Sequence, residues 1–245
     1  MVVAFGAEFL AKKMLHSIRH YQGDRIRAII IERGLLRPID VLLVGATGTG
    51  KSSTLNAIFG DAVCKVGDGV DPQTQDVSDY LVHDYLRIHD SAGLGDGVAA
   101  DTRHAQNITE ALLRRVGGDK DFKNNGFMDL VLVILDGGSR DLGTVFRLLE
   151  QVVLKTISAD RMIVAINQAD MAMKGHHWNF SQCCPDYELE KFLSEKADSV
   201  QRRIKESTGL EIKKPVCYSA RYHWNLARLV DHIIAHIPRS RRTMA

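Results

Sequence analysis

The segment Gly45–Ser52 carries the clearest chemical signal in the chain. It reads Gly-Ala-Thr-Gly-Thr-Gly-Lys-Ser, which fits GxxxxGK[ST], and it lies between the apolar run Val41–Val44 and a predicted helix over Gly50–Phe59. Glycines let the main chain approach a polyphosphate and direct N–H groups at it, and the start of a helix adds a positive end. Lys51 would place a charge at the β- and γ-phosphates, and the Ser52 hydroxyl would bind Mg2+. The residues predicted to hold the phosphates are Gly45, Thr47, Gly48, Thr49, Gly50, Lys51, Ser52 and Ser53.

A second motif is typical of loops that respond to a γ-phosphate. The segment Asp90–Gly93 fits DxxG and follows the predicted strand Leu86–His89. Asp90 would hold Mg2+ through water, and the Gly93 N–H would contact the γ-phosphate. Thr74, in the loop before this strand, would add its hydroxyl to the metal shell. We therefore predict Lys51, Thr74 and Gly93 as catalytic residues, and Ser52, Thr74 and Asp90 as metal ligands.

The segment Asn167–Asp170 predicts which base is bound. It reads NxxD and follows the buried run Met162–Ile166. The carboxylate of Asp170 can accept both N–H groups on the Watson–Crick edge of guanine, whereas adenine has no matching pair of donors. Asn167 would tie this loop to the phosphate loop, and Gln168, where guanine-binding motifs usually have lysine, would cover the base. The residues predicted to bind the nucleoside are Asn167, Gln168, Asp170, Ser219 and Ala220, with the Ala220 N–H directed at guanine O6. The predicted ligands are GTP and GDP with Mg2+.

These motifs need a scaffold, and the hydrophobic pattern predicts one of alternating strands and helices. Continuous apolar runs separated by amphipathic stretches are typical of parallel strands covered on both faces. The predicted strands are Val41–Val44, Asp76–Tyr80, Leu86–His89, Leu130–Leu135, Met162–Ile166 and Pro215–Tyr218. The predicted helices are Gly50–Phe59, Leu142–Lys155, Glu188–Ser207 and Trp224–His236, and Lys174–Pro185 is predicted to be a long loop.

The two ends of the chain are predicted to lie outside this scaffold. Residues 1–37 would form a helical extension packed on the main domain of residues 38–238, and residues 239–245 would form a solvated basic tail. Lys12 and Lys13 interrupt the apolar N-terminal run, so neither a secretory signal nor a membrane span is predicted. The formal net charge of +2 is too small to indicate nucleic-acid binding by itself. The four cysteines show no CxxC spacing, and we expect free thiols in a cytoplasmic protein.

Five segments resemble the G motifs of the TRAFAC-class GTPases: Gly45–Ser52, Thr74, Asp90–Gly93, Asn167–Asp170 and Ser219–Ala220. The stretch Gly48–Ala57 is similar to the Era-like group. Asp71–Thr74 and Asn167–Asp170 are most similar to bacterial YfjP/YeeP-like GTPases, often called 50S ribosome-binding GTPase-like. The resemblance spans about Ile39 to Pro238. It implies a Ras-like α/β sandwich of three layers, with a mostly parallel six-stranded sheet that contains one antiparallel strand.

The resemblance implies a switch that hydrolyses GTP, although one expected group is missing. In Ras-like enzymes a glutamine shortly after the DxxG motif orients the attacking water, whereas Leu94 follows Gly93 here. Gln73, Gln75 and Arg103 are candidate helpers. We therefore predict slow hydrolysis, accelerated by homodimerisation across the nucleotide face or by a separate activator.

Two cellular roles stay open from the sequence. The first is a regulatory GTPase in RNA- or ribosome-linked assembly, which the family resemblance and the basic tail favour. The second is a septin-, immunity-GTPase- or Toc-like module that assembles through its GTPase face, with membrane association and little intrinsic hydrolysis. The similar phosphate loop and the helical N-terminus favour this second role.

Overall fold

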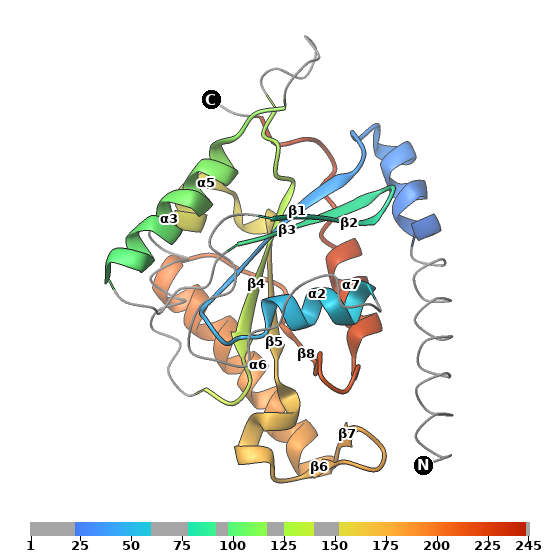
Figure 1. Cartoon of the computed structure of the whole chain (residues 1–245), viewed down its shortest axis with the longest axis vertical. Helices are drawn as coiled ribbons and strands as arrows, with labels where there is room; N and C mark the ends of the chain where they lie inside the picture. The colour runs from blue at the N-terminus through green and yellow to red at the C-terminus, as the bar shows by residue number, and fades with distance from the viewer. Residues whose placement is uncertain (1–22, 60–77, 92–97, 117–124, 140–151, 244–245) are drawn as a thin grey trace.

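The computed structural model of the chain describes residues 23–59, 78–91, 98–116, 125–139 and 152–243 (Figure 1). A helix over residues 23–33 comes first. The strands are β1 (Ile39–Gly45), β2 (Ser78–His83), β3 (Leu86–Asp90), β4 (Leu130–Asp136), β5 (Met162–Asn167), β6 (Trp178–Asn179), β7 (Cys184–Pro185) and β8 (Val216–Cys217). The α-helices that follow are α2 (Lys51–Phe59), α3 (Val98–Leu113), α5 (Leu154–Thr156), α6 (Tyr187–Thr208) and α7 (Leu226–Ile234). Two 3-10 helices, η3 (Ala159–Arg161) and η4 (Ala169–Gly175), flank β5.

One six-stranded sheet organises the molecule, with the strand order β2-β3-β1-β4-β5-β8. β1 is parallel to β3 and β4, and β5 is parallel to β4 and β8, whereas β2 runs antiparallel to β3. Every residue of β1 is buried, because its apolar sequence IDVLLVG is covered on both faces. The predicted α/β fold with one antiparallel strand is confirmed.

Alternate residues of the central strands point into two separate cores. Leu42 and Val44 of β1 pack in a core with α3 and α6. Val41 and Leu43 pack in the other core, with α2, α7 and the helix of residues 23–33. The two cores lie on the two faces of the sheet. The carboxyl ends of the parallel strands therefore share one edge, where the phosphate, metal and base motifs meet.

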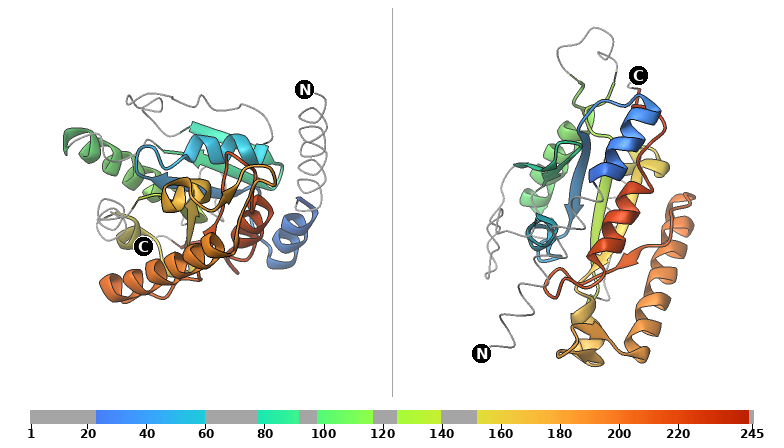
Figure 2. Two further views of the ribbon diagram at one scale, coloured as in Figure 1. Left: turned by 90° about the horizontal axis from the view of Figure 1, so that it is seen from below. Right: turned by 90° about the vertical axis from the view of Figure 1, so that its right-hand side faces the viewer.

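The helix of residues 23–33 packs on the sheet's α7 face, beside α7 (Figure 2). Ile26 and Ile30 are buried in the shared core. Arg25 forms an ion pair with Asp231 of α7, and Arg33 donates to the carbonyl of Pro238 at 3.2 Å. The predicted packing of a helical extension is confirmed for this part, whereas residues 1–22 lie outside the described residues.

The prediction of a solvated basic tail is wrong for two of its arginines. The Arg241 side chain is only 7% exposed and pairs with the buried Asp129 at 2.9 Å. Arg242 is also buried, and it donates to the carbonyl of Thr156 at 2.9 Å and to that of Leu112. Carbonyls at the ends of buried elements attract guanidinium donors, so these residues belong to the interior.

Several local predictions also change. The segment predicted as the loop Lys174–Pro185 contains the end of η4 and a small hairpin of β6 and β7, on which Trp178 is buried. The α3 helix had no counterpart in the prediction, and the strand expected at Asp76–Tyr80 is β2, a few residues later. Most of the predicted helix Leu142–Lys155 lies outside the described residues.

Within the described part, no helix is long and apolar enough to cross a membrane.

Candidate functional site

The phosphate loop connects the end of β1 to the start of α2, as predicted. Two of its glycines are required by close contacts. A Cβ on Gly45 would lie 2.6 Å from the Ile134 carbonyl oxygen, and one on Gly50 would lie 2.4 Å from Asn167 Nδ2. Gly50 also has a φ of +82°, a conformation that other residues rarely adopt. The loop is therefore held against β4 and against the segment Asn167–Asp170, the predicted base loop.

Lys51 is the first residue of α2, and its amine is directed back into the loop. Nζ donates to the carbonyl oxygens of Gly45 and Ala46, at 3.2 Å each. The charge thus lies inside the curve of the loop, next to the positive end of the helix, which favours a polyphosphate. The following residues, Ser52 and Ser53, belong to the first turn of α2.

Ser52 and Asp90 meet at the predicted metal position. Ser52 Oγ donates to Asp90 Oδ2 at 3.3 Å. The other carboxylate oxygen, Oδ1, is buried without a hydrogen-bond partner in the part of the chain that the structure describes. Burial raises the pKa of Asp90 to about 6, against the opposing effects of the Lys51 charge and the Ser52 hydrogen bond. A hydroxyl and a carboxylate with a spare oxygen form a hard-oxygen donor set, so these residues fit Mg2+.

Asn167 joins the phosphate loop to the two base-binding segments. Its Nδ2 donates to the Thr49 carbonyl at 3.0 Å, and its Oδ1 accepts the Ala220 N–H at 3.0 Å. The predicted link from Asn167 to the phosphate loop is confirmed. The same Ala220 N–H was expected to contact guanine O6, and that contact stays a prediction.

Asp170 is held in place by Ser219. Asp170 is 4% exposed, and its Oδ1 accepts a 2.6 Å hydrogen bond from Ser219 Oγ. Ser219 Oγ in turn accepts the Tyr222 N–H at 3.2 Å. The sequence placed Ser219 in the site but did not indicate this role. The arrangement leaves Asp170 with a fixed orientation, as hydrogen-bond recognition of a base edge requires.

Gln168 bridges the base loop and the phosphate loop. Its Nε2 donates to the Gly48 carbonyl at 2.6 Å. Its main chain is left-handed, with a φ of 59°. The side chain therefore has a structural partner in the phosphate loop, an interaction that the motif alone did not indicate.

A buried pair that the sequence did not reveal connects the same regions. Thr54 Oγ1 donates to the Gly50 carbonyl at 2.7 Å and lies 2.8 Å from the Tyr218 hydroxyl. Tyr218 is fully buried and directly precedes Ser219. The pair ties α2 to the end of β8, so the phosphate and base segments form one connected unit.

Some predicted residues cannot be placed in this site. Thr74 and Gly93 lie outside the described residues, as do Gln73 and Gln75. Arg103 is exposed on α3. The predicted roles of these residues therefore stay predictions.

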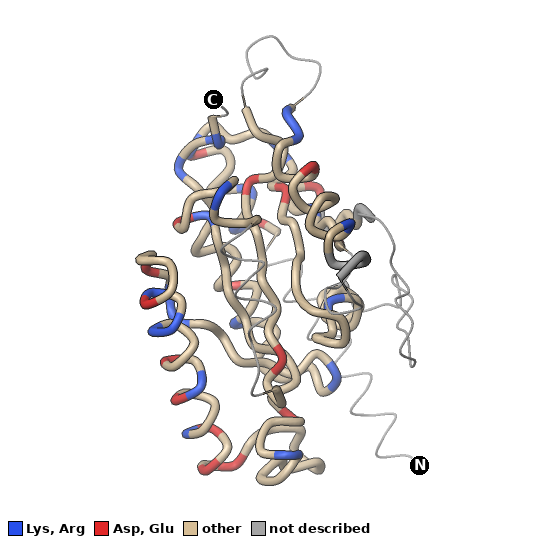
Figure 3. The backbone as a smooth tube through the Cα atoms, turned by 90° about the vertical axis from the view of Figure 1, so that its left-hand side faces the viewer, with Lys and Arg blue, Asp and Glu red and all other residues tan. Residues whose placement is uncertain are grey.

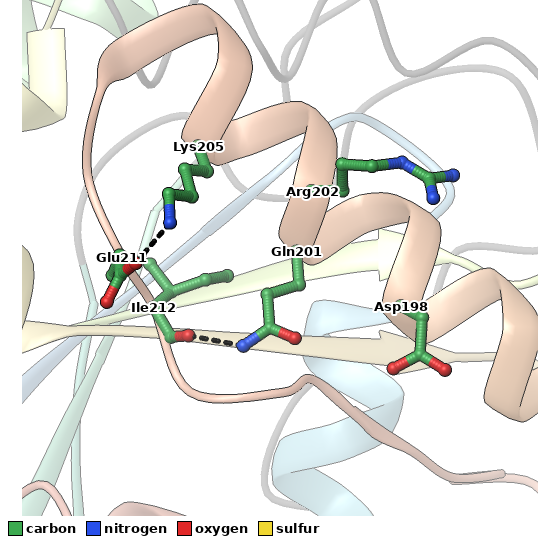
Figure 4. Close-up of a pocket in the computed structure, with 6 residues that line it drawn as sticks. All are labelled: Asp198, Gln201, Arg202, Lys205, Glu211 and Ile212. Atoms are coloured by element: carbon green, nitrogen blue, oxygen red, sulfur yellow. Dashed lines mark hydrogen bonds and ion pairs between the residues drawn. The ribbon is translucent and has the colours of Figure 1, made fainter.

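A pocket of about 340 Å³ lies elsewhere, along the C-terminal half of α6 (Figure 4). Three of its polar side chains are engaged within the pocket itself. Lys205 forms an ion pair with Glu211, and Gln201 donates to the Ile212 carbonyl at 2.7 Å. It contains none of the residues predicted to bind a nucleotide. Among the described residues, no group of three or more His, Cys, Asp or Glu side chains is placed to hold a metal ion.

Sequence comparisons agree with this site. Residues 40–168 match the family model described as 50S ribosome-binding GTPase. The chain is 27% identical over 202 residues to the uncharacterized protein YfjP of Escherichia coli K12. That match covers 80% of this chain and 61% of YfjP, so the chain spans less than two thirds of this relative.

Solved structures show the same fold. Toc33 from Arabidopsis thaliana, in complex with GDP and Mg2+, has a TM-score of 0.60 at 15% identity, covering 91% of this chain and 94% of Toc33. Era in complex with MgGDPNP and 16S ribosomal RNA has a TM-score of 0.55 at 16% identity, covering 83% of this chain and 58% of Era. A third structure concerns the chloroplast translocon components atToc33 and psToc159, for whose GTPase activity dimerization is described as important. It has a TM-score of 0.61 at 14% identity, covering 92% of this chain and 94% of that chain.

Proposed function

Because the chain belongs to the 50S ribosome-binding GTPase family, we propose that it binds GTP with Mg2+, hydrolyses it to GDP and phosphate, and acts as a nucleotide-dependent switch. The observation that carries this proposal is the connection of the Asp170 carboxylate to the phosphate loop. Ser219 orients Asp170, and Asn167 bonds to Thr49. Because the residue that recognises the base is fixed relative to the loop that holds the phosphates, the site can select one nucleotide.

Each part of the nucleotide has a matching group. The phosphate-loop N–H groups, Lys51 and the start of α2 would hold the phosphates. Asp170 would accept the two N–H groups of the guanine edge. Ser52 and Asp90 would hold Mg2+, which neutralises phosphate charge when bound. Because Asp90 is buried beside Lys51, the protein supplies both a cation and an anion at the same point.

The hydrolytic step depends on residues that we propose from the sequence. Thr74 and Gly93 would contact the metal and the γ-phosphate, and Leu94 offers no group to orient water. We therefore propose slow turnover that a second copy or another activator accelerates. The importance of dimerization for the GTPase activity of atToc33 and psToc159 supports this proposal. Specific activity that stays flat over a wide range of protein concentration would contradict self-activation.

Nucleotide titration tests the binding proposal. Wild-type protein with Mg2+ is expected to bind GTP and GDP and not to bind ATP. Asp170→Ala is expected to lose guanine-nucleotide binding, because the variant has no acceptor for the base edge. Isothermal titration calorimetry with the three nucleotides would measure both effects. Equal binding of GTP and ATP by the wild type would contradict the proposal.

A second candidate is a self-assembling GTP-binding module. The likeness to Toc33, which covers almost all of both chains, supports it. Size measurement with GDP and with a non-hydrolysable GTP analogue tests it, because only a nucleotide-dependent assembly changes mass between the two.

An RNA-linked role has less support on this chain. The side chain of Arg241 and the whole of Arg242 are buried, and α6 carries acidic and basic residues interleaved along its length (Figure 3).

A further inference from the structure

Lys196 of α6 reaches the turn that follows β4. Its Nζ donates to the carbonyl oxygen of Gly137 and to that of Ser139, the latter at 2.8 Å. The side chain is half-buried, and burial lowers the pKa of the Lys196 amine, against the attraction of Asp136. Charge-assisted hydrogen bonds in a partly desolvated setting are stronger than exposed ones. Lys196 thus fixes the position of this turn relative to α6.

The turn rests directly on the main chain of the base loop. The Gly137 N–H donates to the Asn167 carbonyl at 2.7 Å. A Cβ on Gly137 would lie 2.7 Å from that same oxygen and 2.9 Å from the Gln168 carbonyl oxygen. Main chain therefore contacts main chain, with no side chain to absorb a shift of the turn.

The part of the base loop under this contact is conformationally demanding. Gln168 has a φ of 59°, a left-handed conformation that residues other than glycine rarely adopt. Such a residue keeps its conformation only where its surroundings impose it. Asn167 and Asp170 lie on either side of Gln168, so its conformation determines how the Asp170 carboxylate faces the base.

We propose that Lys196 is a positioning residue for guanine selection. By holding the turn at Gly137 against Asn167, it fixes the loop that carries Asp170. Lys196 does not itself touch the nucleotide. The inference rests on the proposed function, since it assumes that Asp170 binds the guanine edge.

The experiment compares GDP with inosine diphosphate, which lacks only the exocyclic amine of guanine. The ratio of their dissociation constants measures how well Asp170 accepts that amine. Lys196→Met keeps the length of the side chain but removes its donors. We expect the ratio to shrink about five- to tenfold, the range of a modest coupling between sites. Lys196→Arg keeps two donors and is expected to restore the ratio.

Lys205→Met is the matched control, because Lys205 lies on the same helix and pairs only with the exposed Glu211 in the described contacts (Figure 4). It is expected to leave the ratio unchanged. Reduced stability alone would lower the amount of folded protein without changing the ratio. If Lys196→Met does not fold, Lys196→Gln, which is too short to reach both carbonyls, takes its place.

The outcomes separate the two proposals. A wild type that binds no guanine nucleotide would overturn the proposed function itself. A wild type that prefers GDP to inosine diphosphate, together with a lysine variant that keeps the full preference, would overturn only the role of Lys196.

Discussion

Asp90 ends β3 with a carboxylate that the protein only partly satisfies. Ser52 donates to one oxygen, and the other is buried without a partner among the described residues. Burial raises the pKa of Asp90 to about 6. Because this folded-state pKa lies above the unfolded value, the contribution of Asp90 to stability is present at low pH and is lost as the pH rises through 6. The residue suits cation binding at the expense of stability.

Asp90→Asn should therefore stabilise the nucleotide-free protein at pH 8, by up to about 3 kcal/mol in the free energy of unfolding. This gain should shrink as the pH falls from 6 towards 4, where the wild-type carboxylate is protonated as well. The same variant should lose the Mg2+ dependence of nucleotide binding. Urea denaturation between pH 5 and 8 measures the first effect. A difference between the two proteins that stays constant over this range would contradict the account of Asp90.

Contiguous motifs made part of the site predictable at the level of residues. The phosphate loop and the base loop each lie within a few residues of sequence, so their chemistry is visible without a fold. The contacts that hold these two loops in place are not visible in the sequence. Ser219 reaches Asp170 across 49 residues, and Tyr218 reaches Thr54 across 164. No local pattern in the sequence specifies such pairs, since they arise only when the sheet brings strand ends together.

At the level of elements, the helix of residues 23–33 offers a direct test of docking. Two adjacent isoleucines differ sharply in exposure: Ile30 is 5% exposed in the core, whereas Ile31 is 68% exposed. Ile30→Ala should lower the free energy of unfolding by about 2–5 kcal/mol, because it leaves a cavity against the core. Ile31→Ala should change it by less than about 0.5 kcal/mol. Equal effects in urea denaturation would mean that the helix does not pack as described.

The central strands were predictable because burial on both faces demands continuous apolar runs. Elements that are less buried were not predictable in this way. Among the residues of α3 whose burial is described, 102–113, the buried apolar ones are Ile108 and Leu112, so its periodicity is faint. β6 and β7 are two residues long each, and their pairing depends on the turn between them and on the burial of Trp178. The small hairpin beside the base loop therefore became visible only in three dimensions.

Across the whole molecule, the two ends of the sheet carry different chemistry. The carboxyl ends hold the nucleotide motifs, whereas the amino ends of β1 and β4 hold two buried carboxylates. The Asp40 N–H donates to Asp129 Oδ2 at 3.0 Å, and Arg87 pairs with Asp40 at 2.6 Å. Arg241 pairs with Asp129 and donates to the Leu36 carbonyl at 3.0 Å, across 205 residues. The C-terminal segment thus fixes the start of the sheet.

Arg241→Met should destabilise the protein by about 3–5 kcal/mol at pH 8, because it removes the ion-pair partner of the buried Asp129 carboxylate. Burial raises the pKa of Asp129 to about 6 even with Arg241 beside it, so without that cation the carboxylate of the variant should take up its proton at a higher pH than in the wild type. The loss should therefore be smaller at pH 5 than at pH 8, as measured by urea denaturation. Adding Asp129→Asn to Arg241→Met should recover most of the stability at pH 8, and Arg239→Met, at an exposed position, should change little. A deficit that is independent of pH and is not rescued by Asp129→Asn would show that the arginine acts through its carbonyl contacts and not through the buried carboxylate.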